Sequence, residues 1–122
     1  MFTIANDGTI RLTRGDTFST SVLINIGTDE VPARYVLREN DKLYFAVCEP
    51  NQKWEDALIK KTFDNTDLDD RGDVVVKFST EDTEYIEPGT YYYQIKFFMA
   101  ATENTKEKID TIVPRTKFIV VE

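Results

Sequence analysis

The chain has 122 residues, with 15 basic and 22 acidic side chains that give a net charge of −7, and it contains no histidine. This length fits one domain with a hydrophobic core of its own, so we expect a single domain over residues 1–122. The negative balance opposes binding to nucleic acid or to an anionic membrane surface, and neither is an expected partner. The absence of histidine removes the commonest general base and the commonest metal ligand.

Cys48 is the only cysteine, so the chain can form no internal disulfide. It falls at the end of a strand pattern, where we expect an inert small side chain. The sequence shows neither a basic and then apolar leader nor an apolar run long enough to cross a bilayer. These features predict a protein that is made and folded in a cytoplasm.

The N-terminal part of the chain shows two strand patterns that turn signals separate. Asn6-Asp7-Gly8 predicts a turn, and the alternating residues 9–13 that follow it predict a short strand. Residues 18–26 alternate over a longer run, which only Leu23 interrupts. We therefore expect one long strand over residues 18–26, and then a polar connection with an irregular edge segment near residues 35–37.

The middle of the chain predicts three further strands. Residues 41–47 alternate clearly, and residues 74–78 form a short run rich in valine. Residues 54–63 suit a helical turn, through Trp54, Leu58 and Lys61, or a strand, and we favour a strand over residues 57–63. Residues 79–82 have the spacing of a capping box, which predicts one helical turn that must end before Pro88.

Residues 86–99 carry the strongest strand signal, and the rest of the chain supplies partners for it. Pro88 and Gly89 break the backbone, and Gly89 can adopt a positive φ at such a turn. The strand that follows has one nearly apolar face, which we expect to line the interior. That face consists of Tyr91, Tyr93, Ile95, Phe97 and Met99, and the opposite face of Tyr92, Gln94, Lys96, Phe98 and Ala100.

The last strand signals are residues 109–113 and residues 118–121, with a kink expected at Pro114. Seven or eight short strands separated by turn signals, with at most one short helical turn, predict an all-β fold. The expected architecture is an antiparallel β-sandwich, and a closed barrel is the alternative.

No motif assembles a catalytic, cofactor-binding or metal site. Asp67, Asp69 and Gly72 occupy the first, third and sixth positions of an EF-hand calcium loop. Arg71 and Phe78 stand at the fifth and twelfth positions, where that loop requires oxygen ligands. We therefore expect no metal, no cofactor and no enzymatic activity.

Two further patterns bear on partners. Arg-Gly-Asp occurs at residues 14–16 and at residues 71–73, directly before a strand in each case, and we interpret both copies as turns rather than adhesion motifs. Tyr44, Tyr92 and Phe98 fall on the outward phase of their strands. We take these three as a possible interface, with a second buried layer as the alternative.

Several short motifs follow one another in an order that resembles a known family. They are residues 10–12 with 14–17, residues 41–45, residues 59–61, residues 87–93, residues 110–114 and residues 118–120. Together they resemble the small immunoglobulin-like domains of tailed-phage structural proteins, especially the N-terminal domain of the phage baseplate upper protein. The resemblance implies an immunoglobulin-like β-sandwich without enzymatic activity, which attaches and positions components of a virion.

From this resemblance we expect a noncatalytic phage or prophage virion structural protein, made in the bacterial cytoplasm and then built into the virion. Its partners would be other phage structural proteins, with a homo-oligomer possible. Because the chain stops at Glu122, we expect a free-standing accessory or connector protein rather than a full baseplate arm.

The alternative is a fibronectin type III-like adhesion or carbohydrate-binding module. Residues 88–90, placed before a tyrosine-led strand, are similar to the tyrosine corner of that family. The family places its corner tyrosine at the position of Tyr92, whereas the apolar alternation here follows Tyr91.

Overall fold

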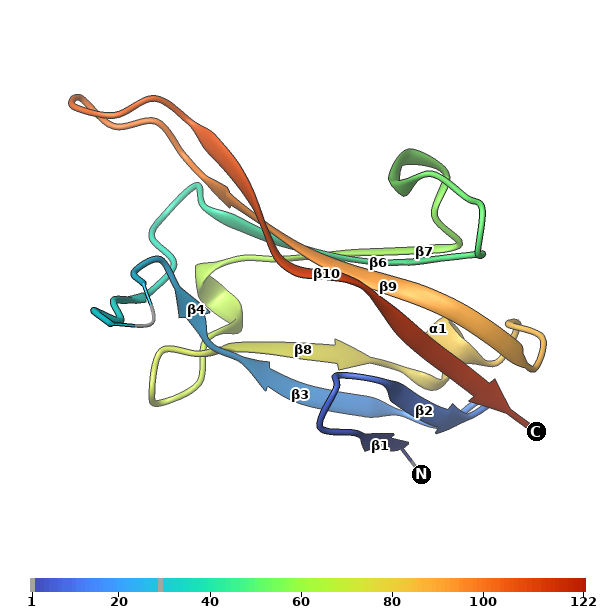
Figure 1. The fold of residues 1–122 in the computed structure, drawn as a ribbon. Coiled ribbons are helices and arrows are strands. Elements are labelled where there is room, and N and C mark those ends of the chain that lie inside the picture. Colours follow the sequence, from blue (N-terminus) through green and yellow to red (C-terminus); the bar gives the residue numbers. More distant parts are fainter. Residues whose placement is uncertain (1, 29) are drawn as a thin grey trace.

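The computed structural model describes residues 2–28 and 30–122, which form short and long β-strands with three single-turn helical elements (Figure 1). The strands are β1 (Phe2–Ile4), β2 (Ile10–Thr13), β3 (Phe18–Val22), β4 (Ile24–Asn25), β5 (Arg34–Tyr35), β6 (Lys42–Cys48), β7 (Ile59–Phe63), β8 (Val74–Phe78), β9 (Gly89–Met99) and β10 (Lys108–Val121). The helical elements are α1 (Thr80–Thr83) and the 3-10 turns η1 (Trp54–Asp56) and η2 (Asn65–Asp67). The predicted all-β class is confirmed.

The strands exceed the predicted seven or eight because β1, β4 and β5 span only two or three residues each. Such short segments carry too few side chains for a readable alternation. No helix in the described ranges has the length and apolar character that crossing a membrane would require.

Six strands form one mixed sheet in the order β1-β2-β10-β9-β6-β7, while β3 pairs with β8 and β4 pairs with β5. The pairings among the described residues are antiparallel, except that β10 runs parallel to β2. A tight turn forces its two strands to be antiparallel, but β2 and β10 are joined only through the rest of the chain. This pair therefore departs from the antiparallel order that we predicted.

The β3-β8 ribbon lies against one face of the six-stranded sheet, as a second layer (Figure 1). Rings from both layers meet between them: the centroid of Phe78 on β8 lies 5.1 Å from that of Phe45 on β6 and 6.3 Å from that of Phe118 on β10. Phe45 also stacks on Tyr93 of β9 at 5.2 Å. Full burial of each such ring contributes about 1.5 to 3 kcal/mol, so this cluster holds the two layers together.

The alternation that we predicted for the central strand is confirmed. Tyr91, Tyr93, Ile95 and Phe97 are buried on β9, and their neighbours along the strand are half-buried. The partner strand β6 presents Leu43, Phe45 and Val47 to the same core, as predicted. The strand at residues 57–63 is also confirmed as β7, and η1 precedes it.

The long strand predicted over residues 18–26 is wrong, because the chain breaks at Leu23. Before the break Val22 pairs with Val74, and after it Ile24 pairs with Tyr35, so the two halves join different sheets. Leu23 itself is 55% exposed. The interruption of the alternation at Leu23 marks the point where the chain changes partner.

The C-terminal strand is continuous rather than a pair, but its register shifts between Thr111 and Val113 and again between Val113 and Thr116. Pro114 lies inside the shifted stretch. Proline has no N–H to give to the ladder, so a strand accommodates it at a bulge. The predicted kink thus appears as a change of register.

The conformation expected at Gly89 is wrong. Positive φ values occur at Gly8, Gly15 and Gly72, and at Asn40 among the other described residues. Gly89 lies at the start of β9, and a Cβ built there would meet its nearest atom, in the Tyr91 ring, at an ordinary 3.7 Å.

The predicted helical turn is present as α1, directly before the Pro88 break. The backbone N–H of Ser79 donates a hydrogen bond of 2.7 Å to the carboxylate of Asp82, which also accepts from the Ser79 hydroxyl. This carboxylate satisfies a donor that the first turn of the helix would leave free.

Candidate functional site

The face of the six-stranded sheet that points away from β3 and β8 carries the residues that alternate with the buried core, and we call it the outer face. By register this face includes Arg11 on β2, Ile109, Thr111, Lys117 and Ile119 on β10, Tyr92, Gln94, Lys96 and Phe98 on β9, Lys42, Tyr44, Ala46 and Cys48 on β6, and Lys60 and Thr62 on β7. Arg115 of β10 lies in the stretch of shifted register and belongs to this face because it lies over the ring of Tyr92.

The three predicted interface residues all lie on the outer face, and each is half-buried. Tyr44 stands opposite Lys96, and Phe98 stands opposite Lys42 on the same pair of strands, so Tyr44 and Phe98 are diagonal neighbours. Tyr92 stands six positions before Phe98 on β9, roughly 20 Å away along the strand. The structure therefore groups Tyr44 with Phe98 and places Tyr92 apart.

An aromatic residue that our sequence reasoning missed, Trp54, belongs to this surface. It lies in η1, which follows β6, and the Nζ atom of Lys96 is 4.5 Å from the centroid of its ring. A cation over the face of a tryptophan contributes about 0.5 to 1 kcal/mol at an exposed site. The sequence placed Trp54 in a possible helical turn, which η1 provides, but no strand alternation assigned its ring to a face of the sheet.

Arg115 fastens the loop after β6 to the outer face. Its guanidinium donates hydrogen bonds to the carbonyl oxygens of Glu49, Pro50 and Gln52, at 3.1, 2.9 and 3.0 Å. The same group lies over the ring of Tyr92, 5.3 Å from its centroid. Tyr92 is thus partly covered by a cation, which leaves Tyr44 and Phe98 as the more open part of the predicted interface.

The same loop accounts for the burial of Cys48. The register places this side chain on the outer face, yet it is only 3% exposed, and its thiol donates to the carbonyl oxygen of Lys53 at 3.7 Å. Burial raises the pKa of the Cys48 thiol above its ordinary value. A thiol kept protonated is a poor nucleophile and a poor metal ligand.

The outer face is rich in cations, although the chain as a whole is acidic. Lys42 pairs with Asp64 at 3.7 Å. The other basic side chains of this face form no ion pair within the part of the chain that the structure describes; they are Arg11, Lys60, Lys96, Arg115 and Lys117. They come from four different strands, so no single stretch of sequence shows the cluster.

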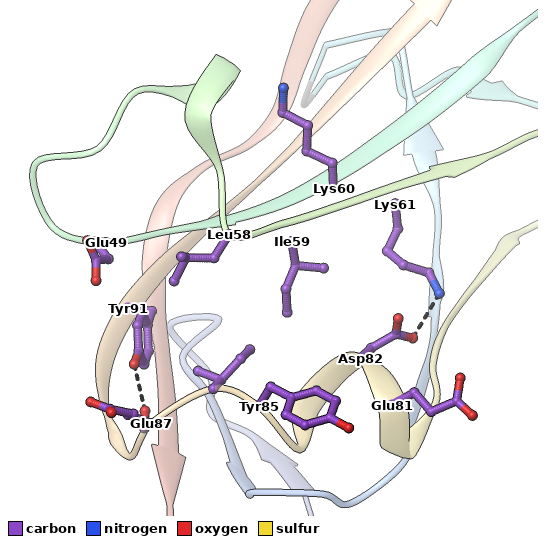
Figure 2. Close-up of a pocket in the computed structure, with 11 residues that line it drawn as sticks. Glu49, Leu58, Ile59, Lys60, Lys61, Glu81, Asp82, Tyr85, Glu87 and Tyr91 are labelled. Atoms are coloured by element: carbon purple, nitrogen blue, oxygen red, sulfur yellow. Dashed lines mark hydrogen bonds and ion pairs between the residues drawn. The ribbon is translucent and has the colours of Figure 1, made fainter.

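A cleft of about 640 Å³ lies on the side of β7 that faces α1, between β7, α1 and the start of β9 (Figure 2). Lys61 points into it and pairs with Asp82 at 2.9 Å, whereas Lys60 points away toward the outer face. Burial raises the pKa of Asp82, but hydrogen bonds from Lys61 and Ser79 outweigh it and hold that pKa below its ordinary value. Asp82 therefore stays ionised, which suits a structural ion pair rather than a proton donor.

In the acidic loop of residues 64–73, which resembles part of an EF-hand loop, the carboxylates accept hydrogen bonds from backbone N–H groups of the turns. Asp69 accepts from the backbone N–H groups of Arg71 and Asp73 at 2.9 and 3.0 Å, and Asp67 accepts from that of Asp64 at 2.9 Å. Across residues 2–28 and 30–122, no group of three or more histidine, cysteine, aspartate or glutamate side chains could hold a metal ion.

Both Arg-Gly-Asp copies are turns, as predicted, with φ of 87° at Gly15 and 86° at Gly72. One charged side chain of each copy forms an ion pair within the chain. Arg14 pairs with Glu122 at 2.7 Å, and Asp73 pairs with Arg34 at 2.6 Å.

No family model, curated protein or solved structure matches this chain.

Proposed function

We propose that this chain is a noncatalytic structural protein of a tailed bacteriophage or prophage, and that it docks onto other virion proteins through the outer face. The accessory, connector and baseplate or tail roles all belong to this proposal. The observation that carries it is the composition of the outer face, where aromatic rings and cations without ion pairs share one open sheet surface.

Such a composition suits contact with another protein. Aromatic residues and arginine are enriched in protein interfaces, where each ring buries a large area with few rotatable bonds. At one end of the outer face Phe98 stands opposite Ile109, which is 61% exposed, and Tyr44 lies diagonally beside Phe98. This end offers an apolar anchor, and the cations beside it can select a partner by charge.

The motif order supports the virion setting of the proposal. The motifs that resemble tailed-phage domains fall on β2, β6, β7, the start of β9, and β10, which are strands of the six-stranded sheet, and on the turns after β2 and before β9. In the resembling family a β-sandwich domain positions virion parts and catalyses nothing.

The test is mass spectrometry of purified particles after the prophage of the host is induced. We expect the chain in the particles, and we expect Tyr44→Ala/Phe98→Ala to reduce its incorporation while it remains folded. The control is Val31→Ala, because Val31 is 71% exposed and lies in the loop between β4 and β5, away from the outer face. Complete and infectious particles that lack the chain, with the chain free in the lysate, would overturn the proposal.

One observation favours the alternative of a fibronectin type III-like adhesion or carbohydrate-binding module. The hydroxyl of Tyr91 donates to the carbonyl oxygen of Glu87 at 2.6 Å, which is the bond of a tyrosine corner. A glycan array separates the two proposals. Binding that Tyr44→Ala abolishes would support the module, and an array without binding would count against it.

A further inference from the structure

The charge of this chain is divided between two parts of the sequence. Residues 64–87 contain nine acidic and two basic side chains, so this segment alone carries the whole net charge of −7. The remaining residues contain 13 side chains of each sign. The basic outer face belongs to this balanced remainder, and it meets the acidic segment through the pair of Lys42 with Asp64.

The acidic segment runs from the end of β7 through η2, β8 and α1 to the turn before β9. Figure 1 shows β8 and α1 on the side of the six-stranded sheet that lies opposite the outer face. Glu81 and Glu87 are exposed around the cleft beside α1, and Glu84 lies between them in the sequence and is half-exposed (Figure 2). None of the three forms an ion pair among the residues that the structure describes. We call these three side chains the acidic side.

We propose that copies of this chain associate head to tail, with the outer face of one copy against the acidic side of the next. The inference rests on the proposed function, and it names a partner for the same docking surface. A nucleic acid would be attracted by the outer face but repelled by the net charge of the whole chain. A second copy instead presents the exposed carboxylates of its acidic side to the outer-face cations that form no ion pair within their own chain.

Contact between two different surfaces leaves a free face and a free acidic side at the two ends. It therefore continues into a ring if the rotation between copies closes, and into a filament if it does not. Because the charges on both surfaces are largely exposed, their attraction should weaken strongly as salt is added.

The experiment is sedimentation equilibrium of the full chain, whose mass is 14.1 kDa, over a range of concentrations at about 0.02 M and about 0.5 M NaCl. We expect the average mass to rise with concentration at low salt and to return to that of the monomer at high salt. A monomer at all concentrations in low salt would overturn the inference. Association that persists unchanged at high salt would do the same, because it would require a different surface.

Two charge reversals test the surfaces separately. Lys117→Glu changes the outer face and Glu87→Lys changes the acidic side, and each should weaken self-association by about fivefold or more. The matched controls are Lys106→Glu and Glu103→Lys, since both residues are exposed in the loop between β9 and β10, outside both surfaces. Equal effects of the controls and the test variants would contradict the assignment of the surfaces.

Mixing decides between loss of the contact and loss of the fold. Each test variant keeps one surface intact, so an equimolar mixture of Lys117→Glu and Glu87→Lys should associate more strongly than either variant does alone. No recovery would overturn head-to-tail contact. If Lys117→Glu lowers incorporation into particles while the native chain is monomeric in solution, the proposed function stands and this inference fails. If the chain associates as described but is absent from particles, head-to-tail association stands and the proposed function fails.

Discussion

The hydroxyl of Tyr91 donates a hydrogen bond of 2.6 Å to the carbonyl oxygen of Glu87, four residues earlier, and so ties the Pro88 turn to the start of the longest core strand. The ring of Tyr91 is buried against the core, which keeps its hydroxyl in place. The turn is therefore held by a side chain of the strand that follows it.

We expect Tyr91→Phe to lower the free energy of unfolding by about 0.5 to 1.5 kcal/mol, because it removes this hydrogen bond and leaves the packing of the ring unchanged. Urea denaturation measures the change. The control is Tyr92→Phe, since no hydrogen bond from the Tyr92 hydroxyl is present among the described residues. An equal loss in both variants would show that the bond contributes nothing specific.

Tyr93→Ala should cost about 3 to 5 kcal/mol, as large aromatic truncations in a core do. The ring of Tyr93 stacks on Phe45 at 5.2 Å, and its hydroxyl donates to the carbonyl oxygen of Gly8 at 2.6 Å. Tyr92→Ala should cost about 1 kcal/mol, since its ring is half-buried and contacts mainly the Arg115 cation. Thermal unfolding of the two variants side by side measures this difference, and similar losses would contradict the burial pattern of β9.

Gly15→Ala should destabilise the fold by about 1 to 2 kcal/mol through backbone strain alone. Gly15 has a φ of 87°, and a Cβ there would meet only the Cβ of Glu84, at 4.0 Å. Gly89→Ala is the matched substitution without a positive φ, and it should change stability by less than about 0.5 kcal/mol. A larger effect at Gly89 than at Gly15 in denaturant unfolding would be inconsistent with these conformations.

Asp41 should make stability depend on acid pH. This carboxylate is fully buried; burial raises its pKa, but hydrogen bonds from the Tyr35 hydroxyl and from the backbone of Ala100 and Arg38 outweigh that effect and hold the pKa below its ordinary value of 3.8. A pKa that folding depresses contributes stability above 3.8, which is lost as the pH falls through the folded value.

We therefore expect Asp41→Asn to cost about 2 to 3 kcal/mol at neutral pH, because the amide turns N–H groups toward donors that the carboxylate accepts from. The difference between the native protein and this variant should shrink as the pH falls below 3.8. Denaturant unfolding at several pH values measures it. A difference that stays constant across this range would mean that the charge of Asp41 does not stabilise the fold.

The Cys48 thiol should react slowly with a thiol reagent such as dithionitrobenzoate in the native protein and rapidly after unfolding. The loop that Arg115 fastens covers this side chain, and burial raises its pKa. Arg115→Ala removes the fastening bonds and should increase the native rate several-fold. A native rate equal to that of the unfolded chain would show that the loop does not cover the thiol.

The sequence by itself determined the features that depend on backbone geometry over a few residues. The pleat of a strand sends successive side chains to opposite faces, so the inward position of Tyr93 and the outward position of Tyr92 could be predicted from their order. The turn role of Gly15 and Gly72 and the single helical turn after Ser79 are local in the same way. Of the candidate site, the outward phase of Tyr44, Tyr92 and Phe98 was predictable for this reason.

Only the tertiary structure decided which strands pair and what covers each face. The alternation is interrupted at Leu23, but it does not show which strands the two halves pair with. Those partners, and the parallel pairing of β10 with β2, involve segments far along the chain, which no local pattern encodes. The burial of Cys48, the position of Trp54 over Lys96 and the division of charge between the outer face and the acidic side arise in the same way. Their side chains belong to separate strands and loops, so only the folded sheet brings them together.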